Sequence, residues 1–152
     1  MRAEDQFHVG IVVDDFETTL VGLSHLFGYE WGAEVGGPTP ATFPTGDAIV
    51  DLRFAYSMSS PRLEIIRSVP GTLWEPARGS GIHHLGYWSD DVARDAAELT
   101  ERGLAMEAAG RRPDGAPHWS FHCGVAGPRI ELVSRALQPA FDHYWATGSF
   151  PG

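Results

Sequence analysis

The chain has 152 residues, of which 43% are hydrophobic, and this is enough for the core of one ordinary domain. The net charge of −9 and the lack of any basic run argue against binding to nucleic acid or to an anionic membrane. Cys123 is the only cysteine, which excludes an internal disulfide. The N-terminus is polar, and no segment approaches the roughly 20 apolar residues of a membrane span, so we expect a cytoplasmic protein.

The first half predicts a strand, a helix and three further strands. The β-branched run 7–13 is typical of a strand, and Asp14 or Asp15 is placed to cap the following helix. The helix has one apolar face, made by Phe16, Leu20, Leu23 and Phe27, and Gly28 ends it. We expect the three strands at about 30–35, 47–57 and 61–68, and a Gly/Pro-rich loop at 36–46.

The second half predicts the same order of elements after a linker at 69–81. A strand at 82–88 leads into a helix that Asp90 or Asp91 caps and Gly103 ends. Three strands are expected at about 103–108, 118–123 and 128–134, with a loop at 109–117 and a terminal helix at 136–146.

These elements predict an α+β fold and one domain over residues 1–152. The domain consists of two tandem βαβββ modules, at about 6–68 and 82–135, and a C-terminal tail at 136–152. We expect the modules to form a curved mixed sheet around a metal cleft.

An internal repeat supports the two modules. Residues 8–15 and 84–91 both read His-x-Gly-x-x-x-Asp-Asp, and residues 61–64 and 128–131 both read Pro-Arg, an aliphatic residue and Glu. His8 therefore corresponds to His84, and Glu64 corresponds to Glu131. Missing such a repeat would misassign the fold.

Strand alternation predicts that these four residues face one place. In each first strand the apolar residues that alternate with the His fit under the helix, and the His faces away from it. Glu64 and Glu131 are likewise flanked by apolar neighbours and face away from the helices. Gly10 and Gly86 lie two residues after each His and leave space beside the imidazoles. Two imidazoles and two carboxylates suit one divalent ion, namely Zn, Ni, Co, Fe or Mn.

Simpler interpretations exist for each residue alone. A single His in a strand is more often a hydrogen-bonded structural residue than a metal ligand, and a Glu in a strand is usually exposed. The paired recurrence at matching positions favours the metal site. Three further residues are candidates for substrate contact, namely Trp88, which shares the face of His84, and His118 and His122, which share a face of one strand.

The sequence resembles the vicinal oxygen chelate superfamily of glyoxalases, bleomycin-resistance proteins and dioxygenases. The resemblance rests on residues 7–15, 63–66, 81–91 and 129–133, and the stretch Gly-Ile-His-His-Leu most resembles methylmalonyl-CoA epimerase. It places the metal ligands on His8, Glu64, His84 and Glu131 and leaves His83 on the helix side or behind the ligands. Glu64 departs from the epimerase, which typically has Gln there, and matches bacterial glyoxalase I, whose helix signature is absent.

The resemblance implies a metal-dependent isomerase, epimerase or lyase that stabilises an enediolate or enolate of a small oxo or acyl-thioester substrate. Glu64 or Glu131 is then the catalytic base. One alternative is a non-catalytic protein that binds a drug or natural product, and another is a ferrous extradiol-type dioxygenase. We expect a small-molecule substrate and a homodimer, which is common in the family.

Overall fold

The structure is a computed structural model that describes residues 1–152, and its strands form one closed barrel. The first half runs through β1 (Gln6–Val13), α1 (Phe16–Phe27), β2 (Val35–Phe43), β3 (Gly46–Tyr56) and β4 (Leu63–Arg67). The second half runs through β5 (His84–Ser89), α2 (Val92–Glu101), β6 (Ala105–Arg111), β7 (Pro117–Cys123) and β8 (Arg129–Ser134). Short 3-10 turns at Ala3–Asp5 and Arg135–Leu137 precede β1 and α3 (Gln138–Thr147).

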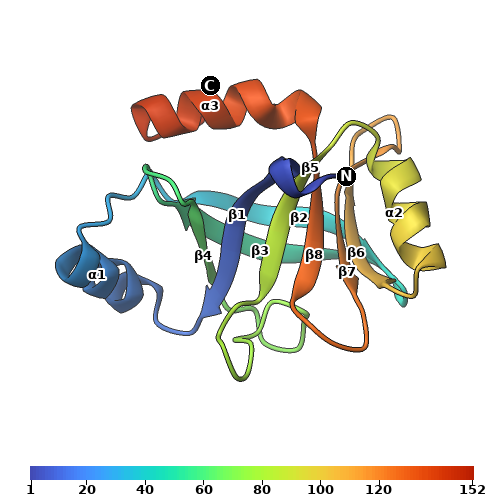
Figure 1. The fold of residues 1–152 in the computed structure, drawn as a ribbon, viewed down its shortest axis with the longest axis horizontal. Coiled ribbons are helices and arrows are strands. Elements are labelled where there is room, and N and C mark those ends of the chain that lie inside the picture. Colours follow the sequence, from blue (N-terminus) through green and yellow to red (C-terminus); the bar gives the residue numbers. More distant parts are fainter.

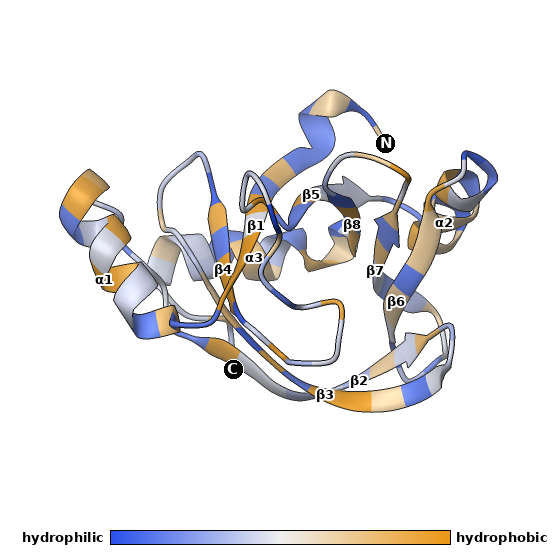
Figure 2. Cartoon of the chain, turned by 90° about the horizontal axis from the view of Figure 1, so that it is seen from below, coloured by the Kyte–Doolittle hydropathy of each residue, from blue (hydrophilic) through white to orange (hydrophobic).

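The barrel order is β1-β4-β3-β2-β6-β7-β8-β5, with β5 returning to β1. The pairs β1–β4 and β5–β8 are parallel, and the other pairs are antiparallel. The predicted α+β class with a curved mixed sheet is confirmed at this level. Helices α1 and α2 lie at opposite sides of the barrel, and α3 lies across the upper end of the strands (Figures 1 and 2).

Each helix covers the apolar residues that alternation assigned to it. Under α1, Phe16 packs against Ile65, with Ile11 and Val13 beside them. Under α2, Val92 and Leu99 pack against Leu132. Asp15 caps the start of α1 with a carboxylate that accepts a hydrogen bond from the backbone N–H of Thr18, and Gly28, with a φ of 74°, caps its end. Phe7 is an exception, because a register shift at this end of β1 turns it to Trp88 instead of α1.

The expected strand at 30–35 and loop at 36–46 are wrong. Only Trp31 forms an isolated bridge, with Ser57, and β2 occupies most of the expected loop. Strand β2 contains Pro38 and Pro40, although proline has no backbone N–H to donate to a neighbouring strand. The two prolines are two residues apart, so their backbone nitrogens face the same edge of β2. This strand pairs with β3 over its whole length but with β6 only at Thr42, so the edge toward β6 is largely unpaired and needs no backbone N–H donor there.

The second half follows the expected elements with shifted ends. Strand β6 extends three residues past the expected 108, and β7 begins at Pro117, so the connecting loop is 112–116. No regular element falls within 69–81, but Trp74 from this segment is 1% exposed and packs in the interior. None of the three α-helices is long and apolar enough to cross a membrane.

Candidate metal site

Four neighbouring strands bring together the residues of the internal repeat. The strands β4, β1, β5 and β8 are adjacent in the barrel, and they carry Glu64, His8, His84 and Glu131 respectively. All four side chains are on the inner side, and each residue is less than 10% exposed. The apolar neighbours that alternate with them hold the strands against α1 and α2.

The four side chains meet with a near-twofold arrangement. Nε2 of His8 lies 2.9 Å from Nε2 of His84. Each imidazole is 3.1 Å from the carboxylate of the other half, which joins His8 to Glu131 and His84 to Glu64. The distances to the carboxylate of the same half are both 3.4 Å.

The two glycines of the repeat make room for this arrangement. Gly10 pairs with His84 between β1 and β5, and Gly86 pairs with His8. A Cβ atom on Gly10 would lie 1.9 Å from Cε1 of His84, and one on Gly86 would lie 1.9 Å from Cε1 of His8. Each glycine therefore gives space to the histidine of the other half.

The cluster is electrostatically coupled. Burial alone would lower the pKa of His8, but Glu131 and Glu64 outweigh burial and raise it to about 9. The same balance raises the pKa of His84. Burial opposes ionisation of Glu64 and Glu131, yet the two imidazoles hold both carboxyl pKa values below the usual range. The carboxylates thus stay charged and attract positive charge to this point.

His83 orients the imidazole of His84 from the side away from the cluster. Its Nε2 lies 2.7 Å from the carbonyl oxygen of Leu73, which can only accept, so Nε2 carries the proton. Burial and the neighbouring His84 lower the pKa of His83 to about 4, so the ring is neutral and its Nδ1 is an acceptor. His84 Nδ1, at 3.0 Å, must then donate to it, which leaves the lone pair of His84 Nε2 directed at the cluster.

The donor set fits a divalent cation. Its four ligand atoms all lie within 4.8 Å of one another. Two ligands held about 2.1 Å from one ion are roughly 3.0 Å apart at a right angle and roughly 3.4 Å apart at the tetrahedral angle. The imidazole and carboxylate distances of 2.9–3.4 Å match this range. In addition, Oε2 of Glu131 is buried and lies 3.1 Å from Nε2 of His8 and 3.4 Å from Nε2 of His84, as expected for atoms that would share one ion.

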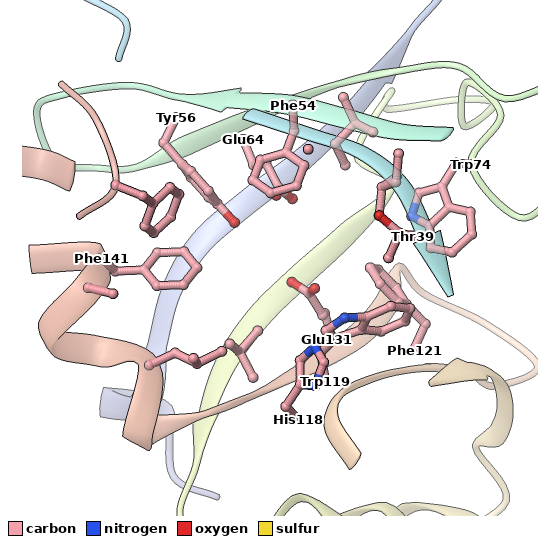
Figure 3. Close-up of a pocket in the computed structure, with 17 residues that line it drawn as sticks. Thr39, Phe54, Tyr56, Glu64, Trp74, His118, Trp119, Phe121, Glu131 and Phe141 are labelled. Carbon is pink, nitrogen blue, oxygen red and sulfur yellow. The ribbon is translucent and has the colours of Figure 1, made fainter. Parts of the chain in front are cut away.

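A cavity of about 330 Å³ opens beside the cluster, and Glu64 and Glu131 are part of its wall. Figure 3 shows the Glu131 carboxylate directed into the space between Tyr56, Phe141, Trp119 and Phe121. Twelve of the seventeen lining residues are hydrophobic. The cluster can therefore meet a small bound molecule while most of that molecule's surface contacts apolar side chains.

The three candidates for substrate contact have different positions. His118 lines the cavity. His122 does not line it. This residue is fully buried outside the cavity wall, where its Nε2 lies 3.0 Å from Ser120 Oγ and its Nδ1 lies 3.4 Å from the Leu104 carbonyl. Trp88 also lies outside the cavity wall, since it stacks on Phe7 with ring centroids 3.8 Å apart and packs under α3. The positions of His122 and Trp88 thus do not support substrate contact.

Sequence reasoning missed Tyr56. It lies opposite Glu64 in the β3–β4 register and lines the cavity. Burial and the charges of Glu64 and Glu131 raise its pKa well above its usual 10, so its hydroxyl keeps its proton. Strand parity places Phe54 and Tyr56 on one face, but only the β3–β4 register reveals that this face meets Glu64. Phe141 of α3 was also missed as a cavity residue, because the helix position does not follow from the repeat.

A family model described as Glyoxalase/Bleomycin resistance protein/Dioxygenase superfamily matches residues 7–123. The chain belongs to this superfamily. The match includes three residues of the cluster and ends before Glu131. No curated protein matches the chain.

Solved structures of the superfamily share the fold. A methylmalonyl-CoA epimerase in complex with methylmalonyl-CoA and NH4+ has a TM-score of 0.59 and 20% identity, over 87% of this chain and 94% of that one. A methylmalonyl-CoA epimerase from Mycobacterium tuberculosis has a TM-score of 0.57 and 18% identity, over 90% and 91% of the two chains. A mutant of 4-hydroxymandelate synthase from Streptomyces coelicolor has a TM-score of 0.52 and 20% identity, over 86% of this chain and 38% of that one. At these identities the likeness concerns the fold alone.

Proposed function

We propose that the protein is a metal-dependent isomerase, epimerase or lyase that removes a proton next to a carbonyl of a small substrate. The observation that carries this proposal is the buried cluster of two imidazoles and two carboxylates at the wall of an apolar cavity. His8, Glu64, His84 and Glu131 would hold one divalent ion. That ion would polarise the substrate carbonyl and stabilise the negative charge that follows proton loss.

The proposal treats residues 1–152 as one domain of two tandem βαβββ modules. Each module supplies one His and one Glu, and the twofold distances of the cluster support this division. The homodimer and the cytoplasmic location stay predictions.

The proton transfer is assigned to a carboxylate of the cluster. Both Glu64 and Glu131 line the cavity, so either can reach a bound substrate. Glu131 is the stronger candidate, because the protonated Tyr56 hydroxyl lies near Glu64 and stabilises that carboxylate instead. Most of the side chains around them in the cavity wall are apolar.

Metal content and proton exchange test the proposal together. Elemental analysis of the purified protein should find about one transition metal per chain, and a His8→Ala/His84→Ala double variant should lose it. In D2O, NMR should detect exchange of the substrate proton next to the carbonyl across 2-oxo compounds and acyl thioesters, with methylmalonyl-CoA among them.

Single carboxylate variants identify the base. Glu131→Gln should abolish the exchange while the circular dichroism spectrum stays unchanged, and Glu64→Gln should impair it. Full exchange activity in both variants would contradict the proton-transfer role. No metal in the wild-type protein, even after reconstitution, would contradict the proposal as a whole.

A second candidate function is supported by the aromatic wall of the cavity, which suits a protein that sequesters a drug or natural product. Such a protein has no use for four converging ligands, so metal-independent binding would favour it. The ferrous dioxygenase is the third candidate. It needs only two His and one carboxylate, and oxygen uptake with a catechol would identify it.

A further inference from the structure

The charge balance of the cluster restricts what can bind beside it. Glu64 and Glu131 are the only charged residues in the cavity wall, and none of the eleven arginines reaches it. The two positive charges of one bound divalent ion would be balanced by the two negative charges of Glu64 and Glu131, so the net charge at the site would be zero. A bound anion would then add an uncompensated negative charge in a buried, apolar space, which is costly.

The cavity wall is largely aromatic, which suits the binding of a ring. The aromatic side chains of Phe54, Trp74, Trp119 and Phe121 lie around one space in Figure 3, and Phe141 of α3 closes its other side. Phe121 also contacts His84, with ring centroids 5.0 Å apart, so the ring-binding wall begins at the cluster. A volume of about 330 Å³ is at the lower end for ligand pockets, which fits a compound of one or two rings.

The wall also contains a hydrogen-bond donor without a partner. Trp74 is 1% exposed, so water cannot reach its Nε1, and this nitrogen makes no hydrogen bond within the protein. Figure 3 shows this nitrogen on the side of the indole that faces Thr39, another cavity residue. Buried donors without partners are rare, so an acceptor on a bound ligand is a natural partner.

We propose that the cavity selects an uncharged, ring-bearing compound whose ring lies among the aromatic side chains and which presents a hydrogen-bond acceptor to Nε1 of Trp74. This inference rests on the proposed function for the metal and goes beyond it in naming the substrate class. It excludes small carboxylates and anionic acyl thioesters as preferred substrates.

Four probes separate the ring from the charge. Each carries a hydroxyl and a carbonyl or carboxyl oxygen on neighbouring carbons: 2-hydroxyacetophenone has a ring and no charge, hydroxyacetone has neither, mandelate has a ring and a charge, and lactate has only the charge. Binding to the zinc-loaded protein is measured by calorimetry. We expect 2-hydroxyacetophenone to bind at least about tenfold more tightly than each of the other three, because it alone buries a ring without adding charge.

The Trp74 donor is tested with a matched pair of variants. A methoxy group at position 3 or 4 of the 2-hydroxyacetophenone ring supplies an acceptor, and at least one of these derivatives should bind more tightly than the parent. Trp74→Phe should remove that advantage. Trp145→Phe, which also deletes a buried indole N–H without a partner but lies outside this cavity, should leave it unchanged.

The outcomes separate the two proposals. If zinc binds at the four ligands but hydroxyacetone or mandelate matches 2-hydroxyacetophenone, the substrate class is wrong and the metal-dependent function stands. If zinc does not bind and 2-hydroxyacetophenone is still preferred, the proposed metal function is wrong. If no methoxy derivative gains affinity, or if the gain survives in Trp74→Phe, the role of Trp74 is wrong.

Discussion

Gly10 lies directly against the imidazole of His84, so that a Cβ atom at this position would be 1.9 Å from Cε1 of the ring. The pairing of β1 with β5 places them opposite each other. Gly86 and His8 repeat the contact. The glycines of the His-x-Gly repeat thus define where the two imidazoles can be, and this relationship makes the geometry of the proposed metal site sensitive to one methyl group.

Gly10→Ala should therefore abolish tight metal binding. The ring of His84 must leave its position, which separates its Nε2 from the other ligand atoms. We expect the metal dissociation constant to rise by at least about 100-fold, since loss of a ligand costs more than loss of a residue that supports one. Competition with a chromophoric chelator measures it.

Gly22→Ala is the matched control. This glycine is inside α1, and nothing lies within 4 Å of the position of its Cβ. The variant should keep its metal affinity and gain about 0.5–1 kcal/mol in the free energy of unfolding. Equal metal affinity in Gly10→Ala and Gly22→Ala would show that the ring of His84 is not a ligand.

His83 should act on the metal through His84. His83→Phe keeps a ring but removes the acceptor for His84 Nδ1–H and the donor to Leu73 O. We expect the metal dissociation constant to increase by about 10- to 100-fold. His122→Phe makes the same change at another buried, hydrogen-bonded histidine that faces away from the cluster. If both variants lose metal affinity equally, the effect is general destabilisation and the positioning role is wrong.

The pH dependence of metal binding has a definite sign. The pKa of His8 is raised to about 9 without metal, so at neutral pH the ligand nitrogens hold a proton that a metal ion must displace. Affinity should then increase by up to tenfold per pH unit below about pH 9 for this proton and level off above it. Calorimetry in two buffers of different ionisation enthalpy would detect the released proton. Affinity that is constant from pH 6 to 8 would contradict this coupling.

The metal-free protein should show the opposite trend in stability. The folded pKa of His8 is above its ordinary value of 6.5, so its contribution is complete below pH 6.5 and is lost as pH rises through 9. The pKa values of Glu64 and Glu131 are lowered from 4.5, so their contribution is present above pH 4.5 and is lost as pH falls. Thermal unfolding after chelator treatment should thus give a maximum between about pH 4.5 and 6.5. A melting temperature that keeps rising from pH 6.5 to 9 would be inconsistent with a protonated His8.

The internal repeat predicted the cluster because the direction of each side chain in it depends only on residues close by in the sequence. Strand alternation and helix caps depend on neighbouring residues, and they place His8 and Glu64 correctly without knowledge of the barrel. The position of β2 could not be predicted in this way, because Pro38 is acceptable only on a strand with an open side. Tyr56 needed the β3–β4 register, and Trp88 needed the position of α3. The features that could not be predicted are therefore those that depend on which strands and helices pack against each other in the fold.

Tyr144 links α3 to the barrel, and its loss should loosen the cavity wall. Its hydroxyl donates to the carbonyl of Ala33 at 2.8 Å and accepts from the backbone N–H of Tyr56 at 3.3 Å. Tyr144→Phe leaves both groups buried without this partner, which should cost about 1–3 kcal/mol in the free energy of unfolding by urea. Because Phe141 of the same helix lines the cavity, binding of 2-hydroxyacetophenone should weaken while zinc affinity stays unchanged.

Tyr87→Phe is the control for this change, since the Tyr87 ring is only partly buried, packs beneath α2 and lies outside the cavity wall. This variant should match the wild type in stability and in binding of both ligands. The comparison separates loss of a phenol from loss of the α3 anchor. If Tyr144→Phe is as stable as Tyr87→Phe and binds the ring compound equally well, α3 is held by its apolar contacts alone and the hydroxyl does not position the cavity wall.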